Sequence, residues 1–301
     1  MGRVVVVGSL NVDRPWRVAR HPRLGETIEG EQLAPLPGGK GLNQAVAARR
    51  MGVDVAIVGR IGDDADGRWL RAVAEGAGIA TDDLEVDVDA PTGTALIVID
   101  DAGANTVTVS PGANRRLEVG TLLVERGDVV VAQLEVPVAA IADAFGQARR
   151  VGARTVLNPS PVPGDRRLLA AADVLVVNEP EMAELTGGSV AAVAGDPVGA
   201  AQELAREGQA VVLTLGAAGV VAVAPDGVHR VEGRSVDVVD TTGAGDCFLG
   251  VLAAGLADGM LLPHALDRAN RAASIAVGRL GTVPAMPTRA EVDRPEGRSR
   301  S

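Results

Sequence analysis

The stretch DVVVAQLEVPVAAIADAFGQARRVGARTVLNPSP, residues 128–161, reads as a strand, a helix and a second strand in that order. Its valine-rich start predicts a strand over 128–135. Residues 137–152 begin with a proline, which suits the first turn of a helix, and residues 154–161 predict a strand that runs into a proline-rich turn. Strands joined by a helix of this length run parallel within one sheet.

The same alternation runs through most of the chain. Further strands are predicted at 3–9, at 55–62, at the start of 173–187 and twice within 209–225, and further helices at 41–52, at 64–78, at the end of 173–187, at 242–259 and at 265–281. Strands that alternate with such helices predict an α/β domain, in which helices cover both faces of a mostly parallel sheet.

Two segments break the alternation. Residues 14–36 contain no clear helix, and residues 92–110 read as two strands around a DDAGAN turn. We assign both to a small β appendage of one domain that spans 1–293, and we expect the polar tail 294–301 to be disordered. A lid over a substrate site is one role for such an appendage, and an ornamental hairpin is the alternative.

The composition limits the partners and the compartment. The 301 residues are 47% hydrophobic, which suits one sizeable core, and the formal net charge of −10 argues against nucleic acid as the main partner. The single cysteine, Cys247, allows no intrachain disulfide and favours a cytoplasmic location. Because no apolar run reaches about 18 residues, no membrane span is expected.

The segment PGGKGLNQA, residues 37–45, is a glycine turn before a predicted helix, and it contains Lys40, the only lysine of the protein. An ammonium group is a compact point charge that arginine replaces poorly where space is tight. Lys40 is therefore a candidate ligand-binding residue; the alternative is a chance survivor on a surface loop. The segment is not a Walker A loop, because G-x-x-x-x-G-K-[ST] occurs nowhere in the chain.

The segment DTTGAGDCFLG, residues 240–250, is a second glycine turn that leads directly into a helix. Backbone N–H groups of such a turn, together with the helix N-terminus, form an anion hole. Asp246 lies in the first helical turn beside it. This carboxylate is either a general base for a hydroxyl that attacks a phosphoryl group or an N-terminal helix cap.

The segment GSLNVD, residues 8–13, follows the first predicted strand and places Asn11 and Asp13 at its carboxyl end. Ligands of open α/β sheets bind at the carboxyl ends of the strands, and an amide with a carboxylate suits a polyhydroxyl ligand such as a sugar. An ordinary turn is the alternative. No dinucleotide-binding glycine pattern follows this strand, and three scattered histidines with one cysteine form no zinc pattern.

These motifs coincide with those of a known family. GGKGLNQAVAARRMG resembles the first signature of the ribokinase-like (PfkB-type) carbohydrate kinases, and DTTGAGDCFLGVLAAGL resembles the second. Six shorter motifs also match in the family's order, and several look most like those of the ribokinases: GSLNVD, PGAN, QLEVP, LNPSP, NEPEMAELTG and LTLGAAGV. The resemblance implies a Rossmann-type α/β domain, with a central, mostly parallel sheet flanked by helices. It also implies a β-sheet lid, often paired with a second lid in a homodimer.

The resemblance further implies phosphorylation of a sugar's primary hydroxyl, with ATP and Mg²⁺ and with D-ribose as the favoured acceptor. It makes Asp246 the base and Gly243, Ala244 and Gly245 the anion hole. The family's sugar-binding positions fall on Asn11, Asp13, Gly39, Lys40, Asn43, Glu135 and Asp246, and its nucleotide-binding positions on Asn178, Thr214, Gly216, Gly219, Gly245 and Asn270. Its monovalent cation, K⁺, would lie among Asp240, Thr242, Ala276, Arg279 and Gly281, where Ala285 replaces an expected serine.

Other readings stay open. The acceptor could instead be fructose, 2-keto-3-deoxygluconate or a nucleoside, and four arginines of the appendage, Arg14, Arg17, Arg20 and Arg23, keep a sugar acid open. A non-catalytic sugar- or nucleotide-sensing protein on the same scaffold is an alternative of another class, because fold alone does not establish activity. The intact Asp246 and its glycine turn argue against that alternative.

Overall fold

The computed structural model describes residues 2–294, so the expected disordered tail lies outside the described residues except for Arg294. Within them, the chain forms a nine-stranded sheet and a separate five-stranded sheet. The strands of the larger sheet are β1 (Val4–Val7), β5 (Val55–Gly62), β6 (Leu84–Asp87), β9 (Val129–Gln133), β10 (Arg154–Asn158), β11 (Val174–Asn178), β12 (Ala210–Thr214), β13 (Gly219–Ala224) and β14 (Gly227–Glu232). Those of the smaller sheet are β2 (Asn11–Val18), β3 (Gly30–Gln32), β4 (Leu36–Gly38), β7 (Gly93–Asp100) and β8 (Asn105–Ser110).

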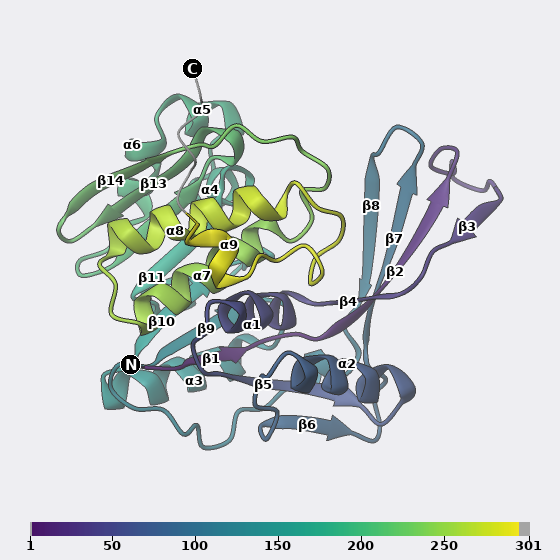
Figure 1. Ribbon diagram of the computed structural model, residues 1–301, viewed down its shortest axis with the longest axis horizontal. Helices are drawn as coiled ribbons and strands as arrows, with labels where there is room; N and C mark the ends of the chain where they lie inside the picture. The colour runs from purple at the N-terminus through teal and green to yellow at the C-terminus, as the bar shows by residue number, and fades with distance from the viewer. Residues whose placement is uncertain (1, 295–301) are drawn as a thin grey trace.

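Helices cover both faces of the larger sheet (Figure 1). The α-helices are α1 (Lys40–Arg50), α2 (Ala65–Gly76), α3 (Val138–Val151), α4 (Glu179–Thr186), α5 (Val190–Gly195), α6 (Pro197–Leu204), α7 (Ala244–Ala257), α8 (Leu262–Ala276) and α9 (Arg289–Val292). Short 3-10 helices lie at η1 (Gly112–Arg116), η2 (Arg166–Ala171) and η3 (Gly216–Ala218). No helix of residues 2–294 is long and apolar enough to cross a membrane.

The larger sheet has the strand order β14-β13-β12-β11-β10-β9-β1-β5-β6, and it is parallel except at β13 and β14. The valines of β1 are buried on both sides: Val4 and Val6 belong to the core under α1, α7 and α8, and Val5 and Val7 to the core over α3 and α4. A strand buried on both faces needs a continuous β-branched run, which explains VVVV. The predicted α/β fold with a mostly parallel sheet is confirmed.

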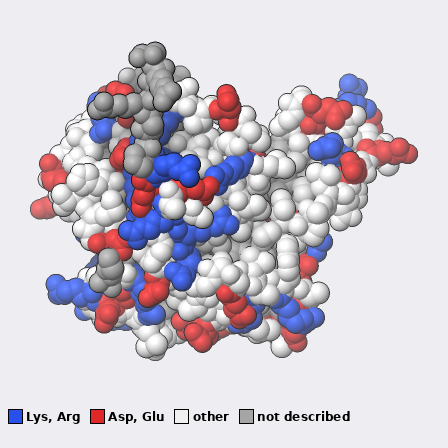
Figure 2. Space-filling model, viewed as in Figure 1, with Lys and Arg blue, Asp and Glu red and all other residues white. Residues whose placement is uncertain are grey.

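The smaller sheet joins segments that are far apart in the sequence. Its strand order is β3-β2-β7-β8, with β4 paired to β2 as well. β2 begins at Asn11, only a few residues after β1 ends, so the chain passes from one sheet directly into the other. The ordinary-turn reading of GSLNVD is therefore wrong, because Asn11 and Asp13 lie on a strand. The smaller sheet stands away from the main body, and an open notch separates the two (Figures 1 and 2).

Several predicted boundaries differ from the structure. The helix predicted at 265–281 begins earlier, with Pro263 in its first turn, and ends at Ala276. The short elements β6, β14, α5 and α6 were not predicted. β6 and β14 are edge strands that carry exposed polar residues, so their hydrophobic alternation is weak. α5 and α6 are short segments rich in alanine and glycine, so they show no clear helical hydrophobic period.

Candidate active site

The predicted sugar-binding residues and the predicted base meet where the two sheets join. Asn43 Nδ2 donates to Asp246 Oδ2 at 3.0 Å, which links α1 to the first turn of α7 across 203 residues of sequence. The backbone N–H of Lys40 donates to Glu135 Oε2 at 3.2 Å, which links the start of α1 to the turn after β9. Ser9 Oγ donates to the same oxygen of Glu135. Residues from three distant motifs therefore form one polar cluster.

β2 adds Asn11 and Asp13 to this cluster. Asn11 Oδ1 accepts from Asn114 Nδ2 at 2.8 Å, and Asn114 also bonds both backbone groups of Leu10, so the PGAN motif holds the start of β2. Asp13 is 9% exposed and lies against Gly38. The charges of Glu135 and Asp246 raise its pKa, so it is close enough to interact with the base.

The glycines around Lys40 let α1 begin directly against the β1–β2 connection. A Cβ on Gly39 would lie 2.7 Å from the backbone nitrogen of Asn11, and one on Gly41 would lie 2.6 Å from the backbone nitrogen of Ser9. Gly39 also has a φ of +88°, a conformation that favours glycine. The GGKG sequence is thus required for the close approach that brings Lys40 to the cluster.

Asp246 does not cap its helix. The N-cap of α7 is Gly243, with no side-chain capping bond, so the capping alternative is wrong. Both carboxylate oxygens instead accept side-chain N–H groups: Oδ2 from Asn43 and Oδ1 from Gln44 Nε2 at 2.8 Å. Burial raises the pKa of the neighbouring Cys247 thiol to about 12, so this thiol stays protonated at neutral pH and does not compete as a base.

The cluster holds more negative than positive charge. Lys40 is half-buried, and although burial alone would lower its pKa, the carboxylates of Asp246, Glu135 and Glu181 raise it. Burial, with the charges of Glu135 and Asp246, raises the pKa of Asp13 to about 7. Lys40 is therefore a structured cation among carboxylates, and the surface-loop reading of this residue is wrong.

The predicted anion hole lies at the N-terminus of α7. Gly243 has a φ of +73°, and a Cβ on it would lie 3.0 Å from Thr282. The backbone conformation and the close packing therefore both favour glycine at this position. Gly245 is different: it is exposed, and a Cβ on it would meet no atom within 4 Å. Since no contact among residues 2–294 requires glycine there, close approach of a ligand to the backbone is the physical reason that fits.

Two of the predicted nucleotide-binding residues, Asn178 and Thr214, lie at the carboxyl ends of β11 and β12. Asn178 and Thr214 are register partners there, and the Asn178 side chain accepts from the backbone N–H of Glu181 at 2.8 Å. Asn270 Nδ2 donates to the carbonyl of Glu232 at 2.9 Å, which ties α8 to the end of β14. Gly216 is the first residue of η3, and Gly219 follows its last residue. A Cβ on Gly219 would lie 2.1 Å from the carbonyl oxygen of Val231, so this glycine is needed for strand pairing.

The predicted cation residues also lie together. Asp240 accepts the backbone N–H groups of Thr242 and Gly281, each at 2.9 Å. Burial alone would raise the pKa of Asp240, but these hydrogen bonds lower it, so an ionised carboxylate lies between the two loops. The Arg279 side chain points elsewhere, to Glu291 at 2.5 Å, so only its backbone carbonyl could face a cation. Among residues 2–294, no three His, Cys, Asp or Glu side chains are grouped to hold a metal ion.

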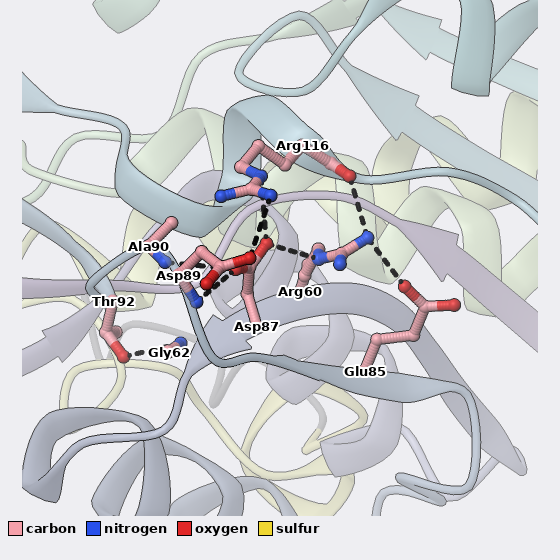
Figure 3. Close-up of polar contacts among 8 residues, drawn as sticks. All are labelled: Arg60, Gly62, Glu85, Asp87, Asp89, Ala90, Thr92 and Arg116. Atoms are coloured by element: carbon pink, nitrogen blue, oxygen red, sulfur yellow. Dashed lines mark hydrogen bonds and ion pairs between the residues drawn. The ribbon is translucent and has the colours of Figure 1, made fainter.

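An ion-pair network fixes the base of the smaller sheet (Figure 3). The side chain of Asp87 is 1% exposed and lies 2.8 Å from Arg60 Nε and 3.1 Å from Arg116 Nε. Its Oδ1 also accepts the backbone N–H groups of Asp89 and Ala90. Arg116 belongs to η1, which follows β8, and Asp89 and Ala90 lie just before β7. The network therefore joins the points where the chain enters and leaves the β7–β8 hairpin.

Four residues of the cluster were not predicted as site residues. Gln44 bonds the base, Gln133 bonds Gln44, Asn114 bonds Asn11, and Glu181 faces Lys40. All four stand inside motifs quoted above, but sequence alone gives no indication of which motif residues point at one another. Prolines and glycines mark turns in a sequence, but nothing in the local sequence shows that a polar side chain will be buried against a distant partner.

Comparisons with known proteins assign this arrangement to a class, the carbohydrate kinases. Residues 1–289 match the pfkB family carbohydrate kinase description, and the chain belongs to this family. It is 36% identical over 299 residues to the ribokinase of Mus musculus, covering 94% of this chain and 91% of that protein. It is also 34% identical over 297 residues to a bifunctional ribokinase/ribose-5-phosphate isomerase A of Fructilactobacillus sanfranciscensis, of which it spans 55%.

Solved structures agree with this membership. The ribokinase of Cryptococcus neoformans var. grubii in complex with ADP has a TM-score of 0.85 and 31% sequence identity, with 97% of this chain and 99% of that chain covered. The ribokinase of Arabidopsis thaliana complexed with ribose and ATP has a TM-score of 0.83 and 29% identity, with 97% and 98% covered. The predicted family is thus confirmed.

Proposed function

We propose that this protein transfers the γ-phosphoryl group of ATP to the primary hydroxyl of D-ribose, giving D-ribose 5-phosphate and ADP. The observation that carries the proposal is the position of Asp246. It touches Asn43 of the sugar cluster on one side and lies in the first turn of the glycine-bounded α7 on the other. The relatives named ribokinase, and the similar structure that holds ribose and ATP, support ribose as the acceptor.

The chemistry divides between two neighbouring groups. Asp246 takes the proton of the acceptor hydroxyl as its oxygen bonds to the γ-phosphorus, and the bond from that phosphorus to the bridging oxygen of ADP breaks. The backbone N–H groups of Gly243, Ala244 and Gly245, at the helix N-terminus, stabilise the negative charge of the transferred group. Asn11, Asp13, Gly39, Lys40 and Glu135 hold the sugar so that its hydroxyl lies beside the base.

The nucleotide would lie along the carboxyl ends of β11 and β12, held by Asn178, Thr214, Gly216, Gly219 and Asn270. Mg²⁺ bound with the nucleotide phosphates would supply further charge neutralisation, and magnesium ions in kinases usually need only one or two protein carboxylates.

We also propose a K⁺ site beside the anion hole. The ionised Asp240 carboxylate and the backbone carbonyls near Thr242, Ala276, Arg279 and Gly281 are the hard oxygen ligands that an alkali cation prefers. The residues present fit the ion, except that Ala285 offers no hydroxyl.

A neutral acceptor fits this site better than a sugar acid. Arg14 is paired with Asp66 of α2 at 2.5 Å, and Arg20 forms an ion pair with Glu26. These two guanidinium groups are therefore already paired with protein carboxylates, which leaves Arg17 and Arg23 as the arginines of the appendage that could meet a substrate carboxylate. The cluster itself presents Asp13, Glu135 and Asp246, which repel an anion.

The smaller sheet is proposed to act as a lid and as the contact surface of a homodimer. It carries exposed apolar side chains, with Leu96 at 43%, Val107 at 54% and Val109 at 47% exposure. Val107 and Val109 pair with Ile97 and Ala95, so these four side chains form one apolar face, whereas Leu96 lies on the opposite face. Analytical ultracentrifugation of the protein and of a Val107→Asp variant tests this: a dimer that the variant dissociates is expected, and a wild-type monomer would exclude it.

The first test of function is ADP release from Mg-ATP in a coupled assay, across ribose, deoxyribose, fructose, 2-keto-3-deoxygluconate, adenosine and pseudouridine. A clear preference for ribose is expected. Preference for another acceptor would keep the phosphoryl chemistry and change the substrate. Nucleotide binding without turnover on any acceptor would favour the sensing alternative.

A further inference from the structure

A chain of buried amides leads to Asp246 through the carboxylate oxygen that Asn43 does not contact. Gln44 Nε2 donates to Asp246 Oδ1 at 2.8 Å, and Gln133 Nε2 donates to Gln44 Oε1 at 2.6 Å. Gln44 is 1% exposed and Gln133 is fully buried. The chain runs from β9 through α1 to α7, so it connects the central sheet with the base through two hydrogen bonds.

The charge of Asp246 sets the direction of both hydrogen bonds. An ionised carboxylate only accepts hydrogen bonds, so Gln44 must present its NH₂ group to Asp246 and its carbonyl to Gln133. Gln133 in turn must present its own NH₂ group to Gln44. Its carbonyl oxygen then points at Gly8, where a Cβ would lie 2.2 Å away. Gly8 therefore leaves the room that this orientation of Gln133 needs.

Gln44 differs from Asn43 in what it can still bind. The Asn43 side-chain oxygen is buried and has no hydrogen-bond partner among the described residues, so it is available to a sugar hydroxyl. Both polar ends of the Gln44 side chain are already bonded to protein groups. Gln44 also packs into the interface of α1 with α7, because a Cβ on Gly250 would lie 2.3 Å from its backbone oxygen. It can therefore act on the reaction only through Asp246.

We propose that Gln44, held in turn by Gln133, is a positioning residue that fixes the carboxylate plane of the base. With Oδ1 tied to Gln44, Oδ2 on the Asn43 side is the oxygen directed at the acceptor hydroxyl. The proposal rests on the proposed role of Asp246 as the base. Both glutamine side chains are buried and hydrogen-bonded in sequence to the base, and a misplacement of about 1 Å at a reacting group can cost on the order of 100-fold in rate.

The test compares kcat with KM in Gln44→Met, which keeps the length of the side chain but removes its donor. We expect kcat to fall at least about 10-fold while KM for ribose and for ATP each change less than about 3-fold. Gln133→Met should lower kcat by a smaller factor. The double variant should be no slower than Gln44→Met alone, because Gln133 acts through Gln44. A native kcat in Gln44→Met, or fully additive losses in the double variant, would overturn the proposal.

Two further variants separate positioning from stability. Gln209 is also a buried glutamine: it is 6% exposed and donates to the carbonyls of Leu169 and Ala172, each at 2.7 Å. Gln209→Met should lower the unfolding midpoint and leave kcat unchanged. Gln44→Glu keeps the shape but sets a second carboxylate against Asp246, so its kcat should fall further than that of Gln44→Met. A kcat in Gln44→Glu equal to that of the wild type would contradict positioning even if Gln44→Met fails to fold.

Asp246→Asn distinguishes this inference from the proposed function. The variant should lose at least about 100-fold in kcat, the low end for loss of a general base. Substantial activity in Asp246→Asn would show that Asp246 is not the general base, and the positioning role of Gln44 would then be excluded as well. An inactive Asp246→Asn beside a fully active Gln44→Met would leave the base in place and overturn only the role of Gln44.

Discussion

Gly38 leaves the space that the carboxyl group of Asp13 occupies. A Cβ on Gly38 would lie 2.2 Å from Asp13 Oδ2 and 2.4 Å from its Cγ. The two residues lie on the paired strands β2 and β4, and Gly38 is followed in the chain by Gly39 and Lys40. Gly38, the first glycine of the GGKG motif, therefore makes room for a side chain of the sugar cluster. Gly39 and Gly41, the other two glycines, let the start of α1 approach the β1–β2 connection closely.

We expect Gly38→Ala to displace Asp13 and to lower kcat/KM for ribose at least about 10-fold, with KM for ATP nearly unchanged. The reason is steric, because the carboxyl group must move to admit the methyl group. Gly76→Ala is the matched control, since a Cβ on Gly76 would meet nothing within 4 Å. Equal kcat/KM for ribose in Gly38→Ala and wild type would show that Asp13 does not contact the sugar.

Asp13 should make stability fall as the pH rises. Its pKa is raised from 3.8 to about 7 in the folded protein, first by burial and then by Glu135 and Asp246. The folded chain therefore holds this proton more tightly than the unfolded chain does. The resulting stabilisation is complete below about pH 4 and is lost as the pH rises through about 7. We expect the free energy of unfolding of Asp13→Asn, measured with urea, to rise relative to that of the wild type as the pH increases. The increase should be about 2 kcal/mol from about pH 5 to about pH 8.

The control for this pH effect is Asp143→Asn, on the exposed side of α3. That variant and the wild type should show the same change of stability with pH. If the stability of Asp13→Asn changed with pH in the same way as that of the wild type, the raised pKa of Asp13 would be wrong.

Lys40→Arg keeps the positive charge and tests whether a compact ammonium group is required. The charges of Asp246, Glu135 and Glu181 act on Lys40. The residues on either side of it, Gly39 and Gly41, have no room for a Cβ. We expect kcat/KM for ribose to fall at least about 10-fold, since a planar guanidinium cannot replace a compact three-donor head there. Arg150→Lys, on the exposed end of α3, should leave kcat/KM unchanged. A fully active Lys40→Arg enzyme would mean that charge alone matters at this position.

The sequence predicted the parts of the site whose cause is local. The runs of valine predicted β1 and β9, and the glycines beside Lys40 and before Asp246 predicted turns with exposed N–H groups. The same was not true of side-chain partners. The hydrogen bond from Gln44 to Asp246 spans 202 residues, and that from Gln133 to Gln44 spans 89. Only the folded sheet order, with β9 beside β1 under α1, brings these amides together.

The smaller sheet shows the same division. Its two segments were predicted as one appendage, but its register depends on the parallel pairing of β2 with β7, two strands from separate parts of the chain. The ion pairs at its base were not predicted either, because Asp87 and Arg116 look like ordinary surface charges in the sequence. These ion pairs matter for stability because Asp87 is buried, and the burial of a residue depends on the fold.

Asp87→Asn tests the base of the smaller sheet. The change keeps the shape of the side chain but leaves Arg60 and Arg116 without their buried counter-charge. We expect the unfolding temperature to fall by at least about 3 °C, because the two guanidinium groups lose the buried carboxylate that they share and keep only the more exposed Glu85 and Asp89. Asp89→Asn is the matched control: Asp89 is 73% exposed and lies 3.7 Å from Arg116, so its loss should change the unfolding temperature by less than about 1 °C. Equal effects of the two changes would refute the special role of Asp87.

Ala285→Ser tests the K⁺ site through the one residue that departs from the family pattern. Ala285 is 2% exposed, and its carbonyl oxygen accepts from Arg279, so its side chain lies within the loop that closes on Asp240. A hydroxyl there adds one hard oxygen ligand. We expect the K⁺ concentration for half-maximal activity to fall at least about 3-fold, with kcat at saturating K⁺ unchanged. Titration of activity with KCl, against tetramethylammonium chloride at equal ionic strength, measures this concentration. A wild-type enzyme that is indifferent to K⁺, together with an unchanged Ala285→Ser variant, would remove the cation site from the mechanism.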